Sequence, residues 1–559
     1  MKRTGHDREQ EDPIYQVTES VGEDALGREV ARRRTFAIIS HPDAGKTTLT
    51  EKILLYAGAV DLAGAVKAKR SQRYATSDWM AMEQERGISI TSTALQFDYA
   101  GCQINLLDTP GHQDFSEDTY RTLMAVDSAV MVLDAAKGIE PQTRKLFDVC
   151  RMRRIPILTF INKMDRPGRE PFDLLDEIER DLSLKAAPWN WPIGDGLTFQ
   201  GVYDRETRQV LLFERTAHGR HHAPIQIRDL EDPRLADLLG DDAVRTLREE
   251  VELLGIAGTS FDREQFLRGE VTPVFFGSAL NNFGMEPFLQ ALGDLAPPPA
   301  PRLSSQGVVD PADEAFSAFV FKIQANLDPL HRDRVAFLRV CSGKFEKDML
   351  VHHARLGRKV RMTRPYKLFA RDRAVIEEAY PGDVIGVVNP GLFAIGDTLS
   401  TVDGLRFDAV PRFTPECFGL LRNRETSAYK RFHKGLEQLA EEGAIRVFYA
   451  VDSLTRDPLL AAIGELQFDL VVARLKTEYS VDAVVERLPY QALRKVTVDP
   501  RTLPDVNWPR DSLLATDDTG DLVALFGSDW SAQYWAEKYP ALGLDRSQPE
   551  PRVHGSRHD

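Results

Sequence analysis

The sequence predicts a multidomain chain: an α/β domain with a doubly wound sheet, then a small β-barrel, then an α+β domain of split βαβ units. Three observations predict this order. Apolar runs alternate with helical patterns in the first half, a proline-rich linker follows, and short alternating strands then give way to strand–helix–strand units. A chain of 559 residues also favours about three or four domains of ~100–200 residues each.

The first half of the chain repeats a pattern of strand and helix. Its short apolar runs are residues 35–39, 103–107, 129–133, 157–161 and 274–276. Their alternation with helical patterns is typical of a doubly wound sheet, whose binding sites lie at the carboxyl ends of the strands. We expect this domain at residues 32–296, after a charged N-terminal extension at 1–31.

The stretch between the last two of these runs is far longer than one helix and one strand need. Residues 170–182 predict an acidic amphipathic helix. Residues 184–261 then predict an insertion, with hairpin-like segments around residues 199–212.

The second half predicts two more domains. A semi-rigid polyproline linker occupies residues 297–304, and short strands punctuated by glycines predict a β-barrel at residues 305–411. Two strand–helix–strand units, an alternating strand and an aromatic helix predict the α+β domain at residues 412–545. A polar tail follows at residues 546–559.

Composition argues against several classes of protein. The four cysteines are widely spaced without a CxxC pair, so neither a disulfide framework nor a zinc site is indicated. The sequence has no apolar run long enough for a membrane span, and its first 33 residues lack the apolar core of a signal peptide. We therefore expect a cytosolic monomer with no membrane partner. A net charge of −14 argues against a general nucleic-acid binder, and we expect no DNA partner, but the charge is compatible with one basic face on an acidic body.

Four short segments each follow an apolar run, where a strand ends and a loop begins. They are Ser40-His-Pro-Asp-Ala-Gly-Lys-Thr47, Asp108-Thr-Pro-Gly-His112, Asn162-Lys-Met-Asp165 and Ser278-Ala279. The first predicts a phosphate-binding loop, in which backbone N–H groups cradle phosphates, the lysine reaches the outer phosphates and the threonine hydroxyl holds Mg²⁺. Serine replaces the first glycine of the usual pattern, so the helical context after the loop matters to the assignment.

The other segments gain meaning from their order. The Asp108 segment, which alone would be a β-turn, follows a strand where a metal and a third phosphate would lie. Asp165 can accept two hydrogen bonds from the guanine N1–H and 2-amino group, a pair that adenine does not offer. Ser278-Ala279 is informative only through its place after the sixth strand. Together the segments predict a P-loop GTPase domain that binds GTP or GDP with Mg²⁺.

His112 is the candidate catalytic residue. A histidine beside an apolar strand is more often structural, but this one directly follows Gly111, next to where the γ-phosphate and the attacking water would lie. Residues 78–93 carry clustered hydroxyls and charges and predict a loop ordered by Mg²⁺ and the third phosphate. Ser89 is the preferred second metal hydroxyl there, and Thr91 is the alternative.

These assignments define one candidate site. The predicted Mg²⁺ ligands are Thr47, Ser89 and Asp108. The predicted nucleotide-binding residues are Ser40, His41, Pro42, Asp43, Ala44, Gly45, Lys46, Thr47, Asp108, Thr109, Pro110, Gly111, His112, Asn162, Lys163, Met164, Asp165, Ser278 and Ala279.

These motifs resemble the ribosome-dependent translational GTPases over residues 32–542. The resemblance includes Gln84-Glu-Arg-Gly-Ile-Ser-Ile-Thr91, Tyr380-Pro-Gly-Asp-Val-Ile-Gly-Val in the barrel and Gly464-Glu-Leu-Gln-Phe-Asp in the third domain. It implies that Lys46, Thr47, Ser89 and Asp108 serve phosphate and Mg²⁺, and that Asn162 and Asp165 serve guanine. It also implies that His112 is brought into position by the ribosome, whose rRNA and proteins are the expected partners.

The domain order narrows the role within that family. Elongation factor G continues with two further domains, for which too few residues follow here, and elongation factor Tu ends in two barrels. Termination therefore fits best: the resemblance implies that the GTP-bound protein drives a class-one release factor off the ribosome after peptide release, without reading the stop codon. The alternatives are another ribosome-bound GTPase of elongation or stress, and a GTP-gated ribosome-binding scaffold without hydrolysis, against which His112 argues.

One basic segment suits contact with rRNA. Residues 355–364 of the barrel, Arg-Leu-Gly-Arg-Lys-Val-Arg-Met-Thr-Arg, carry five positive charges on an otherwise acidic protein. The alternative is a solvated barrel edge that charge protects from pairing with another strand.

Overall fold

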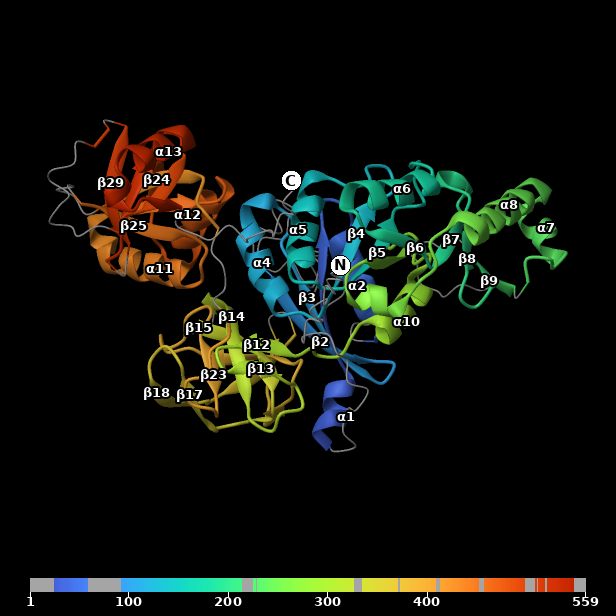
Figure 1. Ribbon diagram of the computed structural model, residues 1–559, viewed down its shortest axis with the longest axis horizontal. Coiled ribbons are helices and arrows are strands. Elements are labelled where there is room, and N and C mark those ends of the chain that lie inside the picture. The colour runs from blue at the N-terminus through green and yellow to red at the C-terminus, as the bar shows by residue number, and fades with distance from the viewer. Residues whose placement is uncertain are drawn as a thin grey trace, which may run out of the picture.

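The computed structural model contains three domains (Figure 1). It describes residues 25–58, 92–213, 225–227, 229–325, 334–369, 372–408, 413–451, 457–497, 508–509, 511–517 and 520–546. In Figure 1 the first domain extends to one end of the molecule, and the barrel and the third domain lie at the other end. Among the helices in these ranges, none combines the length and apolar character needed to span a bilayer.

The first domain is built on a sheet of strand order β2-β3-β1-β4-β5-β11-β6. Neighbours from β3 to β6 are parallel, and β2 runs antiparallel to β3. The strands are β1 (Arg33–Ser40), β2 (Thr93–Tyr99), β3 (Cys102–Asp108), β4 (Ser128–Asp134), β5 (Ile157–Asn162), β6 (Lys185–Pro188) and β11 (Val271–Phe276). The doubly wound α/β prediction is confirmed, with β2 as an antiparallel strand that it did not contain.

Helices cover both faces of this sheet because side chains alternate along each strand. Phe36 and Ile38 of β1 share a core with α2 and α10, whereas Ala37 and Ile39 share the opposite core with α4 and α5. The helices are α1 (Ala25–Ala31), α2 (Lys46–Tyr56), η2 (Gln113–Phe115), α4 (Ser116–Met124), α5 (Pro141–Met152), α6 (Pro171–Leu182) and α10 (Met285–Leu295). Because β1, β3, β5 and β11 run parallel, the loops that follow them meet at one edge of the sheet.

The predicted insertion begins later than residue 184. β6 pairs in parallel with β11, so it is the outer strand of the main sheet, and the insertion starts after it. The rest forms a small antiparallel sheet of order β10-β9-β8-β7 with helices beyond it. These elements are β7 (Asn190–Ile193), η3 (Gly196–Thr198), β8 (Gly201–Asp204), β9 (Gln209–Leu212), β10 (Ile225–Ile227), α7 (Arg234–Leu239), α8 (Asp241–Ala257) and α9 (Arg263–Leu267). Helices α7 and α8 lie at the end of the molecule away from the third domain (Figure 1).

The second domain is the predicted barrel. Its path β18-β17-β23-β14-β15-β22-β19 continues into the first domain, because β19 pairs with β2. Its strands are β12 (Arg302–Ser304), β13 (Gly307–Val309), β14 (Ser317–Ala325), β15 (Arg334–Ser342), β16 (Phe345–Glu346), β17 (Leu350–His353), β18 (Arg358–Arg361), β19 (Pro365–Phe369), β20 (Asp372–Val375), β21 (Glu378–Ala379), β22 (Val384–Val388) and β23 (Thr398–Ser400). Apolar side chains fill its interior, so the barrel has its own core.

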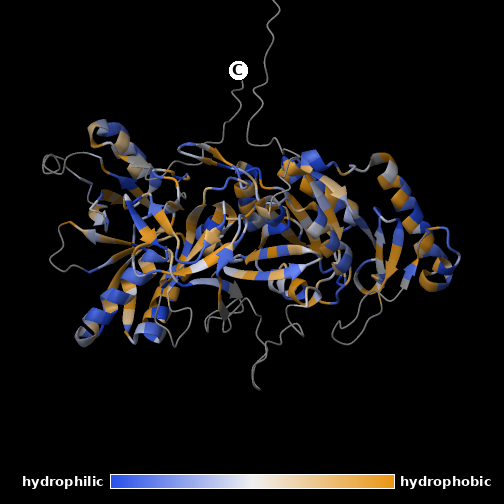
Figure 2. Ribbon diagram, turned by 90° about the horizontal axis from the view of Figure 1, so that it is seen from below, coloured by the Kyte–Doolittle hydropathy of each residue, from blue (hydrophilic) through white to orange (hydrophobic). Residues whose placement is uncertain are grey.

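The third domain packs two helices on an eight-stranded sheet of order β27-β24-β26-β25-β29-β30-β28-β31. Both predicted strand–helix–strand units are present. The elements are β24 (Cys417–Asn423), η4 (Thr426–Ala428), α11 (Tyr429–Glu441), β25 (Arg446–Ala450), β26 (Leu459–Ala462), α12 (Leu466–Tyr479), β27 (Ala483–Leu488), β28 (Ala492–Lys495), β29 (Ser512–Asp517), β30 (Leu522–Phe526), α13 (Asp529–Lys538), η6 (Pro540–Leu542) and β31 (Asp545–Arg546). Hydrophobic and hydrophilic residues alternate along its helices (Figure 2), as packing on one face requires.

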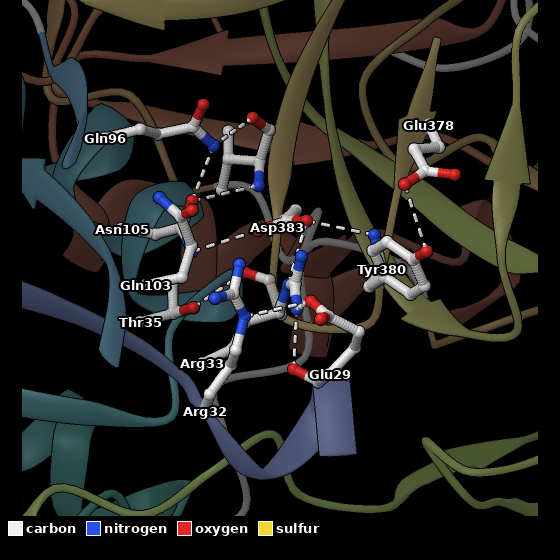
Figure 3. A network of polar contacts seen from close by, with 12 residues as sticks. Glu29, Arg32, Arg33, Thr35, Gln96, Gln103, Asn105, Glu378, Tyr380 and Asp383 are labelled. Atoms are coloured by element: carbon white, nitrogen blue, oxygen red, sulfur yellow. Dashed lines mark hydrogen bonds and ion pairs between the residues drawn. The ribbon is translucent and has the colours of Figure 1, made fainter. Parts of the chain in front are cut away.

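A polar network joins the start of β1 to the barrel (Figure 3). Arg33 donates to the backbone oxygen and the carboxylate of Glu29, both at 2.6 Å, and its Nε lies 2.9 Å from Asp383 Oδ2. The same guanidinium lies over the ring of Tyr380, 4.6 Å from its centroid. The barrel motif at residues 380–387 therefore lies at the contact with the first domain.

Candidate nucleotide-binding site

The first loop has the backbone that phosphate binding requires. It leaves β1 at Ser40 and enters α2 at Lys46, so the free N–H groups at the start of α2 face the loop. Gly45 has a φ of +99°, and a Cβ there would lie 2.2 Å from Asn162 Nδ2. A side chain at this position would both strain the backbone and collide with the third loop.

Lys46 and Asp108 form the polar centre of the site. Lys46 Nζ donates to Asp108 Oδ1 at 2.7 Å and also to the backbone oxygen of Thr109. Both charged side chains are buried, at 6% and 2% exposed, so their charges face each other with little solvent between them. The first two predicted segments are therefore in direct contact.

The residues around Asp108 fit a magnesium ion. Asp108 Oδ2 and Ser40 Oγ are buried and have no hydrogen-bond partner among the described residues. A buried carboxylate oxygen without a donor suits a hard cation, and Mg²⁺ at a nucleotide needs only one or two protein ligands beside phosphates and water. Thr47, the second residue of α2, is half-buried beside the loop. Ser89 and Thr91 lie outside the described residues.

Asn162 holds three of the loops together. Its Nδ2 donates to the backbone oxygen of Ala44, and its Oδ1 accepts from the backbone N–H of Ala279, both at 2.9 Å. One amide thus connects the phosphate loop, the end of β5 and the loop after β11. In this structure the residue fixes the relative position of the loops.

Lys163 connects the same loops through charge. Its Nζ donates to Asp134 Oδ2 at 2.7 Å and to the backbone oxygen of Asp43. Burial alone would raise the pKa of Asp134, but the hydrogen bonds from Lys163 and from the Ala136 N–H hold that pKa below its ordinary value. Sequence analysis missed Asp134. The sequence signal for Asp134 is its place at the end of an apolar run. In the sheet it lies next to Asn162.

Asp165 lies at the rim of this cluster of loops. The preceding residue, Met164, is buried, and its N–H donates to the Gly277 oxygen at 3.1 Å. That contact sets Asp165, which is half-buried, beside the loop of Ser278 and Ala279. The third and fourth predicted segments are thus neighbours.

The remaining loop residues support the backbone. Thr109 Oγ1 donates to the Ile38 oxygen at 2.6 Å, and the Pro110 oxygen accepts from Thr119 at 3.3 Å. His41 Nε2 lies 3.1 Å from Glu140 Oε1. Pro42 is half-buried, and Asp43 is exposed with a φ of +67°.

His112 leaves the second loop next to the phosphate loop. The preceding Gly111 lies beside the phosphate loop, since a Cβ there would be in ordinary van der Waals contact with Pro42, 3.6 Å from its Cα. The His112 side chain is 30% exposed, and its Nδ1 lies 3.3 Å from Asp114 Oδ1. The same nitrogen accepts from the Asp114 backbone N–H at 3.2 Å. The ring is therefore partly open to solvent on one side and fixed on the other.

Of the predicted nucleotide-sensing loop at residues 78–93, the structure describes only Ser92 and Thr93. The Ser92 backbone N–H donates to Asp118 Oδ2 at 2.8 Å. The Ser92 backbone oxygen accepts from Lys322 Nζ of the barrel at 2.6 Å. Burial alone would raise the pKa of Asp118, but Lys322 and Ser92 hold it below its ordinary value. The end of the loop is therefore bound by both α4 and the barrel.

The predicted basic segment forms an edge of the barrel. β18 is the outer strand of its sheet, and Arg358, Lys359 and Arg361 on it are exposed. Arg355 differs, because its guanidinium pairs with Asp397, with Nε 2.7 Å from Oδ1. Three of the segment's charges thus face solvent on β18. Contact with rRNA and a barrel edge protected by charge both require such exposure.

Comparisons with known proteins agree with this geometry. Residues 31–298 match the family model of the elongation factor Tu GTP binding domain, and residues 315–402 match elongation factor G domain 2. Residues 407–536 match the C-terminal domain of class II release factor RF3. The fold and site thus define a translational GTPase, which binds guanine nucleotide.

The relatives identify the family. The chain is 58% identical to peptide chain release factor 3 of Gloeobacter violaceus over 94% of this chain and 99% of that one. It is 54% identical to peptide chain release factor 3 of Symbiobacterium thermophilum over 93% and 98%. The chain belongs to the peptide chain release factor 3 family. A solved structure from Thermus thermophilus shares the fold, with a TM-score of 0.65, 22% identity, and coverage of 83% of this chain and 70% of that one.

Proposed function

We propose that this protein is a ribosome-stimulated GTPase of translation termination that promotes dissociation of class-one release factors after peptide release, without reading the stop codon. One observation carries the proposal. A release-factor C-terminal domain at residues 407–536 follows a GTP-binding domain and a barrel shared with elongation factors. The first two domains supply the GTPase, and the third distinguishes the termination role.

The loops supply the parts that phosphoryl transfer needs. Backbone N–H groups around Gly45 hold the phosphates, and Lys46, which pairs with Asp108 beside the loop, reaches the outer phosphates. Thr47, Asp108 and Ser89 would hold Mg²⁺, which neutralises phosphate charge when bound. Asp165 accepts from the guanine N1–H and 2-amino group, on loops that Asn162 holds in place.

His112 is assigned the catalytic role. The reaction joins a water oxygen to the γ-phosphorus and breaks the bond to the bridging oxygen, giving GDP and phosphate. Orientation of that water and stabilisation of charge are the main contributions a protein can make. His112 begins beside the phosphate loop and is partly exposed, so a ribosome contact could turn its ring toward the water.

The GTP cycle acts through differential binding. A ligand shifts an equilibrium only by its difference in affinity for two states, so the GTP and GDP forms must bind the ribosome differently. The loop that ends at Ser92 is the proposed source of the difference, because α4 and Lys322 of the barrel both bind its end. The exposed charges of β18 and the third domain are the proposed ribosome contacts.

The test is the dissociation rate of a class-one release factor from ribosomes that have released their peptide. It is measured with this protein and GTP, with this protein and GDP, and without the protein. Dissociation that is faster only with GTP supports the proposal. Equal rates in all three defeat the termination role, and accelerated tRNA translocation in a parallel assay would assign the protein to elongation instead.

A further inference from the structure

Asp114 joins the His112 side chain to the third domain. One carboxylate oxygen, Oδ1, lies 3.3 Å from His112 Nδ1. The other, Oδ2, accepts a 2.8 Å hydrogen bond from the backbone N–H of Leu466, the first residue of α12. Asp114 and Leu466 are separated by 352 positions in the sequence, so this contact exists only because the third domain lies against η2.

The contact is buried and closely fitted. Asp114 is 7% exposed, although it follows a loop that is open to solvent at His112. Gly464, just before α12, leaves the space for it, since a Cβ there would lie 2.1 Å from Asp114 Cγ. A carboxylate at the start of a helix also meets the favourable end of the helix dipole. Both features hold the carboxylate against α12.

A second contact ties the same segment to the third domain. Arg121 of α4 donates to the backbone oxygens of Glu442 and Gly443, at 3.3 and 3.4 Å, just after α11. His112, Asp114 and Arg121 lie on one continuous segment, from the second loop through η2 into α4. A movement of the third domain therefore changes contacts within two residues of His112.

We propose that Asp114 is a positioning residue for His112, through which docking of the third domain controls GTP hydrolysis. The proposal rests on the proposed catalytic role of His112. With Oδ2 bound to Leu466, the carboxylate has a fixed orientation and presents Oδ1 to the imidazole. When α12 moves away, the carboxylate loses that anchor and the ring loses a fixed partner. The third domain thus sets the orientation of the ring without touching it.

Three variants separate the parts of this arrangement. D114N keeps the shape and an oxygen for Leu466 but removes the charge beside His112, whereas D114A removes both contacts. G464A changes no residue of the first domain and places a Cβ against the Asp114 carboxylate, so the carboxylate and the start of α12 must move apart. The matched control is E441Q, which weakens the contact of the third domain with Arg334 of the barrel and leaves Asp114 untouched.

The readout is single-turnover GTP hydrolysis at varied ribosome concentration, with GTP affinity and melting temperature measured alongside. We expect D114N, D114A and G464A to lower the maximal rate by about tenfold or more, because the imidazole then no longer lies against a carboxylate of fixed orientation, with unchanged GTP affinity. E441Q should keep the wild-type maximal rate. D114N at the wild-type maximal rate, or an equal loss in E441Q, overturns the proposal.

A double-mutant cycle tests the route itself. If the third domain acts through the carboxylate, G464A causes no further loss once D114A is present, and the two effects are not additive. Fully additive losses contradict the proposal. The H112A variant distinguishes failure of this proposal from failure of the proposed function. A wild-type hydrolysis rate in H112A removes the catalytic assignment of His112. Slow hydrolysis in H112A, with wild-type rates in D114N and G464A, removes only the role of Asp114.

Discussion

Arg339 of the barrel forms an ion pair with Asp127 of the first domain, and the two side chains are 1% and 2% exposed. Arg339 also donates to the Gly382 oxygen at 2.7 Å, and Thr35 of β1 donates to the same oxygen at the same distance. The barrel and the first domain therefore share a buried charge pair next to the contact of Thr35 with Gly382.

Loss of Asp127 should loosen this interface. Asp127→Ala leaves the Arg339 charge buried without its partner, which costs about 3–5 kcal/mol, and the unfolding midpoint in urea should fall accordingly. Replacing both residues, as D127A with R339M, should recover part of the loss. D242N, which removes an exposed pair with Arg245, serves as the control and should leave the midpoint unchanged. An unchanged midpoint in D127A would show that the pair does not hold the domains.

Base specificity should follow Asp165. Asp165→Asn presents a donor where guanine also presents one, so preference should shift from guanine to xanthine nucleotides. The lost charge-assisted contact corresponds to about 1.5–3 kcal/mol, or roughly 10- to 150-fold in GTP affinity. Equilibrium binding of GTP and XTP measures both changes. Unchanged GTP affinity would remove Asp165 from the base site.

Catalysis should depend on His112 more than binding does. His112→Ala should bind GTP normally and lose ribosome-stimulated hydrolysis by at least ~10²-fold, because orientation and electrostatic stabilisation supply most of phosphoryl-transfer catalysis. Stopped-flow GTP binding and phosphate release on ribosomes separate the two effects. A wild-type hydrolysis rate would make His112 structural.

The phosphate loop should not tolerate a side chain at Gly45. Gly45→Ala combines a φ of +99° with a Cβ 2.2 Å from Asn162 Nδ2, so the loop must move and GTP affinity should fall at least tenfold. Gly293→Ala in α10 is the matched control, because its Cβ meets nothing within 4 Å and alanine favours the helix. Equal GTP affinity in the two variants would contradict the geometry.

Barrel stability should depend on acid pH through Asp397. Burial alone would raise the pKa of Asp397, but Arg355 and His353 lower it from 3.8 to about 2. A pKa that is lower in the folded state contributes stability above the unfolded pKa, and this stability is lost as pH falls through the folded one. Asp397→Asn should therefore cost about 2 kcal/mol at pH 7 and progressively less between about pH 4 and pH 2. Hydrogen exchange of barrel amides across this range measures the difference; a constant difference would assign the effect to packing.

The strands that sequence analysis predicted well are those buried on both faces. β1, β4, β5 and β11 read as continuous apolar runs because helices cover each side, and the site loops follow directly from their ends. β2 was missed because it carries Gln96 inside, a polar residue whose Nε2 donates to the Val384 oxygen of the barrel at 2.7 Å. β6 was missed because its short sequence Lys-Ala-Ala-Pro has no β-branched residue.

The same reasoning explains which site residues the sequence revealed. Lys46 and Asp108 belong to motifs with a fixed local spacing, so their contact could be expected before the structure. Asp114 and Lys322 act through partners far along the chain, Leu466 and Ser92, and no local pattern marks such pairs. Contacts between domains are thus the part of the site that required the structure.

The buried pairs between the barrel and the first domain also constrain how the chain is made. Synthesis proceeds from the N-terminus. Asp127 can therefore contact Arg339 only after 212 further residues have been added, and Gln96 can contact Val384 only after 288. A nascent first domain leaves the ribosome before these barrel partners exist, so its contacts with the barrel form only when β22 has emerged. Slow codons placed just after the barrel, rather than at the proline linker, would therefore give these contacts time to form before the third domain is made.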